Sequence, residues 1–311
     1  MVRKPRPGAE AIRVKGWIKA HKWLILRRTS QLTILGLFLL GPLVGIWIVK
    51  GNLAYSETLE VLPLTDPHIL LQAVLAGVKP HTDALIGVGI VVAFYLLVGG
   101  RVFCSWVCPV NLITDAACCT RRMLGIRSAT QISRSSRYWL LGVTLVLPLA
   151  TGVIVWELVN PISMAFRGIL FGLGMAWVIL LGVFLFDLFV AKDGWCGRLC
   201  PVGAFYSLLG YKSLIRVVAE ERDKCNDCMD CFEVCPEQQV ITPALRGADK
   251  DISPVIFSSS CTNCGRCIDV CSEEVFHFGS RFFAEKHTLE TAETAVKTQA
   301  NEKGKTFIDA A

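Results

Sequence analysis

Long apolar blocks dominate the first two-thirds of the chain, in place of strand-like alternation or a helical period. The four blocks span approximately residues 32–49, 84–98, 138–159 and 168–190. A helix needs about 20 mostly apolar residues to cross a bilayer. The pattern therefore predicts four transmembrane α-helices, with the second block the shortest and its ends the least defined.

The pattern changes at about Val218, where polar and charged residues take over. We expect four regions, which are a basic segment at 1–30, a membrane domain at 31–215, a compact cysteine-rich domain at 216–280 and a polar tail at 281–311. The tail lacks large apolar residues at regular spacing, which is typical of a loose segment or a frayed helix.

The membrane domain contains a repeat. In each half one predicted helix leads out and a second returns into C-x-x-x-C-P-V, which reads CSWVCPV at 104–110 and CGRLCPV at 196–202. The repeat predicts a duplicated two-helix unit. Paired repeats usually pack about a pseudo-symmetry axis, which would bring the two cysteine motifs together.

Charge placement predicts the orientation of the helices. Of the 32 Lys and Arg residues, nine lie in 1–30, two in 50–83, six in 99–137, one at Arg167 and fourteen from Ala191 onward. Short loops on the cytoplasmic side carry an excess of basic residues, so both termini are expected on that side. No small-residue cleavage site follows the first block, which argues against a signal peptide. The net charge of +6 is explained by these flanks and requires no nucleic acid.

The composition supports the prediction of a membrane protein, since 53% of the 311 residues are hydrophobic. All fourteen cysteines lie on the predicted cytoplasmic side or at its membrane boundary. Thiols stay reduced in the cytoplasm, so the cysteines are better read as metal ligands or redox groups than as disulfides.

Two cysteine runs share one spacing, C-x2-C-x2-C-x3-C. They read CNDCMDCFEVCP at 225–236 and CTNCGRCIDVCS at 261–272. Bacterial ferredoxins use this spacing for two [4Fe–4S] clusters and exchange the fourth ligand between them. The spacing predicts a bacterial-type 2[4Fe–4S] ferredoxin domain of the α+β class. The expected ligands are Cys225, Cys228, Cys231 and Cys271 for one cluster, and Cys235, Cys261, Cys264 and Cys267 for the other.

Zinc is the competing interpretation of the runs, because C-x2-C is also a zinc spacing. Two identical four-cysteine runs argue against it. The second run departs from the usual pattern only in Ser272, which stands where proline is common.

The paired C-x-x-x-C-P motifs are less specific. On a helix, residues four apart share a face, so we expect the members of each pair to point the same way. Several interpretations stay open, namely a third iron–sulfur site, a pair of redox-active dithiols, a docking contact, or small buried hydrophobic side chains. The residues concerned are Cys104, Cys108, Cys196 and Cys200.

Taken together, these stretches resemble the NapH family of membrane ferredoxin-type proteins. The resemblance covers nearly the whole chain and includes GWIKAHKWLILRR, GPLVGIWIVKGNL, PLTDP, FCSWVCPVNLITD, WELVNPIS, LFDLFVAKDGWCGRLCPVGAFYSLLG, KCNDCMDCFEVCPE and CGRCIDVCSEEVF. It implies a four-helix inner-membrane protein that forms a quinol dehydrogenase with a periplasmic ferredoxin-type subunit. That complex would pass electrons from the quinol pool toward periplasmic nitrate reductase.

A quinol site needs groups that accept protons. The candidates on the predicted outer side are His68, His81 and Glu157, each with the alternative that it merely faces the wet interface. Asp187, inside the apolar FLFDLFV, predicts either a proton or ligand pathway or a side chain that reaches toward Lys192. The sequence shows no catalytic site, so enzymatic activity of the chain alone is left open.

Predicted cytoplasmic clusters and a periplasmic acceptor would be separated by a hydrocarbon core of about 30 Å. The predicted cytoplasmic location of the cysteines therefore supports a second hypothesis, in which the chain is a cytoplasmic maturation or regulatory ferredoxin for a periplasmic reductase. A third hypothesis, a purely structural membrane anchor, is weaker because it gives no reason for eight cluster ligands.

Overall fold

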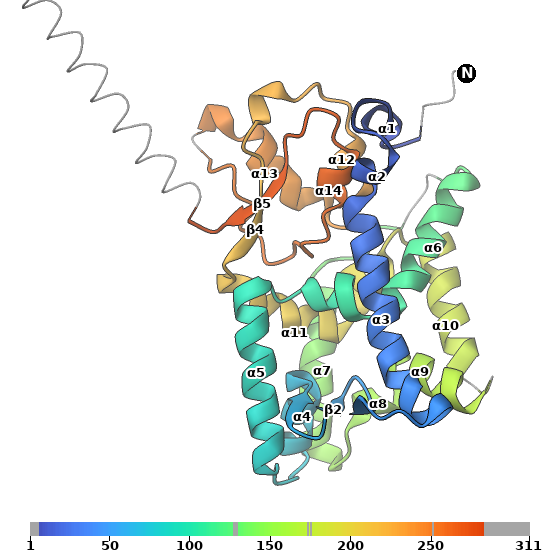
Figure 1. Cartoon of the computed structure of the whole chain (residues 1–311). Helices are drawn as coiled ribbons and strands as arrows, with labels where there is room; N and C mark the ends of the chain where they lie inside the picture. The colour runs from blue at the N-terminus through green and yellow to red at the C-terminus, as the bar shows by residue number, and fades with distance from the viewer. Residues whose placement is uncertain (1–5, 127–129, 173, 175, 251, 283–311) are drawn as a thin grey trace, which may run out of the picture.

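The chain folds into a larger helical part and a smaller cysteine-rich part (Figure 1). The computed structural model describes residues 6–126, 130–172, 174, 176–250 and 252–282. The helices of the helical part are α3 (Lys22–Val44), α4 (Pro67–Leu75), α5 (Thr82–Val98), α6 (Val110–Met123), α7 (Ser136–Thr151), α8 (Val155–Val159), α9 (Pro161–Phe171), α10 (Ala176–Leu185) and α11 (Pro201–Leu209). The tail predicted at 281–311 lies outside the described residues except for 281–282.

Helices occur in all four apolar blocks, but their bounds differ from the prediction. Helix α3 begins ten residues before the first block and ends at Val44, while Val49 belongs to a strand. Helix α7 ends at Thr151, and α8 follows as a separate short helix.

The prediction of one continuous helix at 168–190 is wrong. Helix α9 ends at Phe171, where Gly172 has φ +95°, and α10 runs back against α9. The two helices approach closely at Gly168, because a Cβ atom there would lie 3.1 Å from that of Ala176. A small residue at the contact allows such a hairpin, which blocks of apolar residues alone do not predict.

Among the described residues, one helix is long and apolar enough to cross a membrane by length and composition, namely Lys22–Val44. Three further apolar helices, Thr82–Val98, Pro161–Phe171 and Ala176–Val190, are shorter. Four membrane-spanning helices therefore stay a prediction.

The two halves of the predicted repeat share one local architecture. In each, a π-helical turn ends at the second cysteine of the motif, and a helix follows the proline. These turns are η1 (Phe103–Val107) and η3 (Trp195–Leu199), and a third π-helical turn, η2 (Phe186–Val190), precedes the second motif. Helix α11 packs on α5 and α10 packs on α6, so each half covers the other.

The connection between α3 and α5 folds inward. It begins with a three-stranded antiparallel sheet of β1 (Val49–Gly51), β2 (Tyr55–Thr58) and β3 (Leu62–Thr65), and β3 packs along α5. Helix α4 then lies against α5 and α7, with His68 and Gln72 fully buried. The polar face of α4 is therefore buried against protein.

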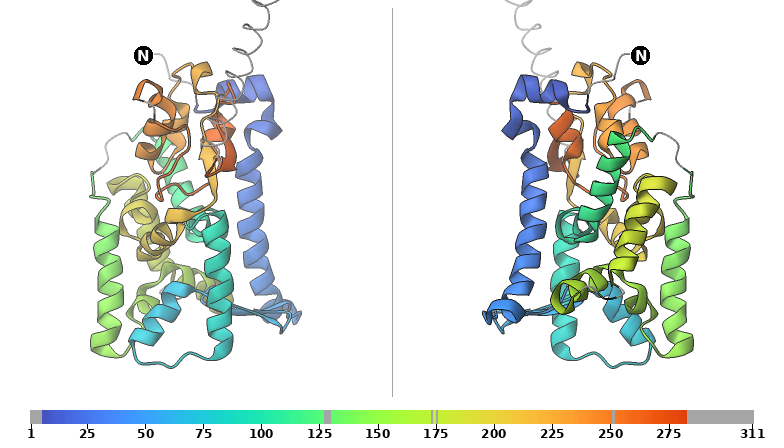
Figure 2. Two further views of the ribbon diagram at one scale, coloured as in Figure 1. Left: turned by 90° about the vertical axis from the view of Figure 1, so that its left-hand side faces the viewer. Right: turned by 90° about the vertical axis from the view of Figure 1, so that its right-hand side faces the viewer.

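The cysteine-rich part is built on a two-stranded antiparallel sheet of β4 (Ile215–Val218) and β5 (His277–Ser280). The short helices α12 (Asp230–Val234) and α14 (Arg266–Val270) pack against each other, and α13 (Ile241–Arg246) closes the core. Figure 2 shows α3 running from this part along the side of the helical part.

The basic N-terminal segment holds the cysteine-rich part in place. Its helices α1 (Ala9–Lys15) and α2 (Trp17–Ala20) pack on α14. The Asp269 carboxylate accepts hydrogen bonds from the backbone N–H groups of Trp23 and Leu24 at 3.1 and 2.9 Å, and so caps the start of α3. A side-chain acceptor at this position satisfies amides that the helix itself leaves unpaired.

The Gly100→Ala substitution should strongly destabilise the fold. A Cβ atom at Gly100 would lie 1.8 Å from the Tyr206 carbonyl oxygen and 2.5 Å from the Gly210 nitrogen, so α11 must move away from the end of α5. We expect a loss of several kcal/mol of stability, as for other overpacked core positions, measured as a lower thermal midpoint in detergent.

Gly89→Ala is the matched control, because Gly89 lies on α5 and a Cβ atom there meets nothing within 4 Å. It should leave the midpoint unchanged or slightly higher. Equal midpoints for both variants would contradict the close approach of α5 and α11.

Candidate functional site

Each of two hollows in the cysteine-rich part is lined by four cysteines, three from one run and one from the other. The first encloses about 360 Å³ and the second about 370 Å³, both including open solvent. The first contains Cys225, Cys228, Cys231 and Cys271. The second contains Cys235, Cys261, Cys264 and Cys267. These groupings coincide with the two ligand sets expected from the spacing.

The backbone wraps each hollow in the same way. Asp227 and Met229 in the first run, and Asn263 and Gly265 in the second, occupy matching positions between the first and third cysteines, and all have positive φ. Positive φ is uncommon for residues other than glycine. Successive residues in such conformations direct their backbone N–H groups toward an enclosed anion. The positive φ angles therefore indicate that both loops bind a ligand.

The hollows fit a cluster better than a single ion. Among the described residues, no group of three or more His, Cys, Asp or Glu side chains is arranged to hold one metal ion. A zinc site would require sulfur atoms at about 2.3 Å from one point. Four thiols around a hollow are instead the donor set of a [4Fe–4S] cluster.

The structure also brings the four cysteines of the C-x-x-x-C-P motifs together. The Cys196 thiol interacts electrostatically with those of the other three, and Cys108 interacts with Cys104 and Cys200. A Cβ atom at Gly203 would lie 3.8 Å from the Cys104 sulfur, so the absence of a side chain there lets the halves meet. We call Cys104, Cys108, Cys196 and Cys200 the cysteine quartet. Burial raises the pKa of Cys200 to about 12, and the neighbouring Cys104 thiol contributes to the rise.

The local geometry differs from the expected four-residue helical spacing. The Cys108 N–H donates to the Phe103 carbonyl at 3.0 Å, and the Cys200 N–H donates to the Trp195 carbonyl at 2.9 Å. These bonds, from each N–H to the carbonyl five residues earlier, are those of π-helical turns, which are frequent at functional sites. Pro201 occupies the first turn of α11, where its missing N–H costs nothing.

A buried carboxylate joins the quartet to the second hollow. Glu237, two residues after Cys235, accepts hydrogen bonds from Arg101 at 2.9 Å and from Arg137 at 3.1 Å. Arg101 also donates to the carbonyls of Ser260 (2.7 Å) and Cys196 (3.1 Å). One guanidinium therefore contacts the residue before Cys261 and a member of the quartet. Burial alone would raise the pKa of Glu237, but Arg101 and Arg137 outweigh it and hold the pKa below its usual range.

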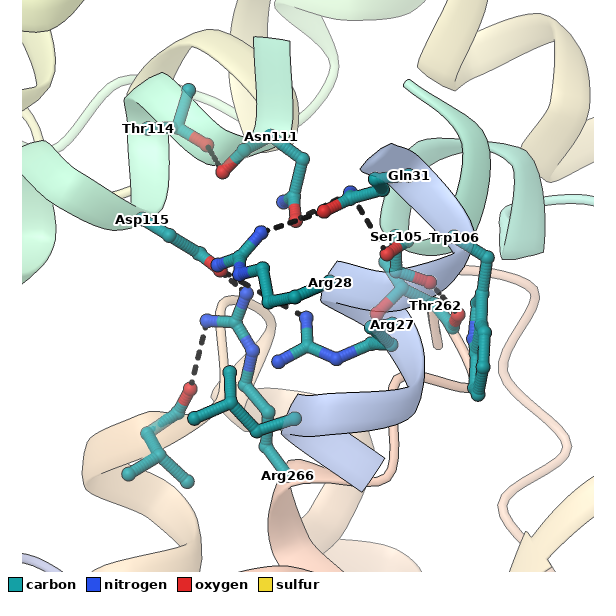
Figure 3. A network of polar contacts seen from close by, with 12 residues as sticks. Arg27, Arg28, Gln31, Ser105, Trp106, Asn111, Thr114, Asp115, Thr262 and Arg266 are labelled. Atoms are coloured by element: carbon teal, nitrogen blue, oxygen red, sulfur yellow. Dashed lines mark hydrogen bonds and ion pairs between the residues drawn. The ribbon is translucent and has the colours of Figure 1, made fainter. Parts of the chain in front are cut away.

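A second network forms around Asp115 of α6 (Figure 3). Its carboxylate pairs with Arg28 of α3 and with Arg266, which lies between Cys264 and Cys267. Arg27 lies 3.8 Å away. Burial would raise the pKa of Asp115, but these guanidinium groups, Arg266 foremost, lower it.

The two networks carry an excess of positive charge. Five largely buried guanidinium groups face two carboxylates. Nitrogen atoms of Arg27, Arg101, Arg137 and Arg266 have no hydrogen-bond partner. Buried charge needs compensation, and a thiolate-ligated cluster is an anion that would supply it. Sequence reasoning missed these arginines, and the only available signal was their place beside the cysteine motifs.

The three residues proposed for a quinol site have different surroundings. His68 is buried beside Thr144 and Gln72, while His81 is exposed at the start of α5. Glu157 is half-buried and pairs with Arg167 at 3.6 Å.

Asp187 does not reach Lys192. Its buried carboxylate accepts from the Trp195 N–H at 2.8 Å, and Lys192 instead donates to the Glu233 carbonyl. Asp187 therefore positions the second cysteine turn.

The cysteine arrangement defines an iron–sulfur protein of the ferredoxin type, and sequence comparisons agree. A family model described as a 4Fe-4S binding domain matches residues 80–125 and again residues 173–217, so that each match contains one C-x-x-x-C-P motif. A 4Fe-4S dicluster domain matches residues 224–275. The predicted ferredoxin-type domain in the C-terminal part is thus confirmed.

The chain belongs to the family of ferredoxin-type proteins that includes NapH and MauN, as the resemblance predicted. It is 48% identical to the ferredoxin-type protein NapH of Escherichia coli, over 90% of this chain and 97% of NapH. It is 49% identical to the methylamine utilization ferredoxin-type protein MauN of Methylorubrum extorquens, over 88% of this chain and 94% of MauN. No solved structure gives a significant match.

The Glu237→Gln substitution should destabilise the junction. It leaves two buried guanidinium groups without their counter-charge, which costs about 3–5 kcal/mol. Because the pKa of Glu237 is lowered by folding, its contribution is complete above the ordinary carboxyl pKa of about 4.3 and is lost as the pH falls. Thermal unfolding in detergent as a function of pH should show this dependence in the wild type and a weaker one in E237Q.

Glu60→Gln is the control, since the Glu60–Lys50 pair is exposed. It should change stability by less than about 1 kcal/mol. An E237Q midpoint equal to that of E60Q would rule out the structural role of the Glu237 network.

Proposed function

We propose that the chain is the iron–sulfur electron-transfer subunit of a membrane quinol dehydrogenase. The observation that carries the proposal is the pair of hollows, each lined by four cysteines from both runs. Their loops and the surplus of buried arginine charge support an anionic redox group at this place. The subunit would take electrons from the quinol pool and deliver them to a periplasmic ferredoxin-type subunit.

In this proposal the eight cysteines of the two runs hold two [4Fe–4S] clusters, with Cys235 and Cys271 as the exchanged ligands. Such clusters, when bound, accept and donate single electrons. The protein's own contribution is positioning. Glu237 and Asp115 fix the cysteine-rich part against the helical part, and Arg101 contacts both the quartet and the loop before Cys261.

The quartet is proposed as a third iron–sulfur site. Four thiols from both halves interact with one another, and the 4Fe-4S binding domain model matches both halves. The alternative is a pair of redox-active dithiols, and iron and acid-labile sulfide analysis distinguishes the two.

Four membrane-spanning segments with cytoplasmic termini complete the proposal. The lipid-facing surface would be the many exposed apolar side chains of α3, α5, α7 and α10, among them Leu43, Phe94, Trp139 and Leu181. Exposed apolar surface of this extent is unusual for a monomeric soluble protein. In this proposal residues 31–215 form the membrane domain, and the ferredoxin domain at 216–280 lies on the cytoplasmic side.

The acceptor has two candidates. The resemblance to NapH favours the chain of periplasmic nitrate reductase, while MauN relatives of similar identity favour methylamine utilization. Deleting the gene in its host and comparing nitrate reduction with growth on methylamine distinguishes them. A deletion strain whose nitrate reductase lacks its cofactors would instead favour the maturation hypothesis.

Reduction by a quinol tests the central proposal. The purified protein, treated anaerobically with menadiol, should develop the paramagnetic signals of reduced [4Fe–4S] clusters, with interaction between the two sites of the cysteine-rich part. Menadione is the control and should produce no signal. Signals with dithionite but none with menadiol would refute a role in quinol oxidation.

Iron and acid-labile sulfide analysis tests the third site. Three clusters of four irons predict about twelve irons in the wild type. They predict about eight in the variant with serine at all four positions of the quartet. The Cys118→Ser/Cys119→Ser variant is the matched control and should keep about twelve. About eight irons in both the wild type and the quartet variant would instead favour a dithiol site.

A further inference from the structure

A buried carboxylate of the outer connection lies one hydrogen bond from the helix that follows the second motif. The Tyr206 hydroxyl of α11 donates to Asp66 Oδ2 at 3.3 Å. The other oxygen, Oδ1, accepts from the N–H groups of His68 and Ile69 and caps α4. The Asp66 carboxylate is therefore held in place from both sides.

The same tyrosine leads to the quartet. Its ring stacks on Phe103, with centroids 4.7 Å apart, and Phe103 directly precedes Cys104. Gly203, less than one helical turn before Tyr206, is the residue that lies against the Cys104 sulfur. Asp66 is thus separated from the quartet by a single layer of side chains.

Within the part of the chain that the structure describes, no cation compensates this carboxylate. Among the described residues Asp66 forms no ion pair, and the titratable groups around it are Tyr206 of α11, Tyr95 of α5, Glu157 of α8 and His68 on its own helix. Helix α7 contributes Thr144, which does not titrate. Burial raises the pKa of Asp66 to about 6, even though its hydrogen bonds favour the anion. The group can therefore gain and lose a proton near neutral pH.

Three residues next to these groups carry unsatisfied polar atoms, namely Thr65 Oγ1, Gln72 Oε1 and Trp156 Nε1. Thr65 directly precedes Asp66 in the chain, the Gln72 amide contacts His68, and Trp156 directly precedes Glu157. All three atoms are buried without a hydrogen-bond partner. Such atoms are costly unless a ligand or water satisfies them, so they indicate a place that receives a polar group.

We propose that Asp66, held by Tyr206, accepts a proton of the quinol when its electrons enter the protein, an inference that rests on the proposed function. Oxidation of one quinol breaks two O–H bonds and gives one quinone, two electrons and two protons. The electrons pass to the iron–sulfur sites, one proton converts the Asp66 carboxylate to the acid, and the other goes to water.

The test uses the full-length protein with its clusters and compares menadiol with dithionite as reductants. Asp66→Asn keeps a side-chain cap for α4 but removes the base. We expect its reduction by menadiol to be at least tenfold slower than that of the wild type. Reduction by dithionite, which requires no proton acceptor, should be unchanged. Asp83→Asn is the control, an exposed acid in the first turn of α5.

The pH profile provides a readout that a structural role would not change. In the wild type the menadiol rate should show an inflection near pH 6 as Asp66 loses its proton, whereas D66N should lack this inflection and keep only the gradual dependence that the quinol itself has. Tyr206→Phe removes a hydrogen bond that lowers the pKa of Asp66, so its inflection should move to higher pH.

Equal menadiol rates and profiles for D66N and the wild type would overturn the proposal. If D66N does not retain iron, an unchanged inflection in Y206F overturns it instead. A wild type that dithionite reduces and menadiol does not would refute the proposed function itself, which is a different result.

Discussion

The structure depends on the enclosure of Glu237 between Arg101 and Arg137. These three charged side chains are almost completely buried, and they come from three segments that are distant in the sequence. Removing two or more ions from water is expensive, and the cost is recovered only where the geometry is good and the remaining donors are satisfied. The carbonyls of Cys196, Gly197 and Ser260 accept hydrogen bonds from the terminal nitrogens of the two arginines, while both Nε atoms stay without a partner. The ion pairs therefore tie the second cysteine turn to the ferredoxin domain.

These buried ion pairs explain why the cysteine-rich part packs directly against the helical part. Glu237 and Arg266 lie within or beside the cysteine runs, and their partners lie beside the first motif and on α6 and α7. Contacts at Ser105 and Trp106 add hydrogen bonds to the loop at Thr262 and Asn263. The hollow of Cys235, Cys261, Cys264 and Cys267 therefore faces the junction. The other hollow includes Cys228, which is exposed.

Local patterns in the sequence predict much of this, and long-range pairs do not. The spacing of the cysteine runs restricts the loops to a few conformations, so the expected groupings of eight cysteines coincide with the two hollows. The repeat correctly indicates that the two motifs meet. A block of apolar residues, however, does not show where a helix ends inside it. The hairpin of α9 and α10 at Gly172 was therefore not predicted. Arg101 and Glu237 are separated by 136 positions, and nothing in a charged residue's own neighbourhood says that it is buried.

The outer connection changes the problem of how charge crosses the protein. In the proposed topology a hydrocarbon core of about 30 Å separates the cytoplasmic clusters from the outer side, and this distance is prohibitive only if the outer segments stay outside. Here β3 and α4 fold inward along α5 and α7, and Asp66 meets α11, the helix that begins after Cys200. An inward-folding connection can satisfy its polar backbone only where protein surrounds it, and the sheet and the Asp66 cap do so. If the proposed function holds, the layer of Tyr206 and Phe103 is all that separates the proposed proton acceptor from the quartet, so proton release and electron entry would take place at neighbouring groups.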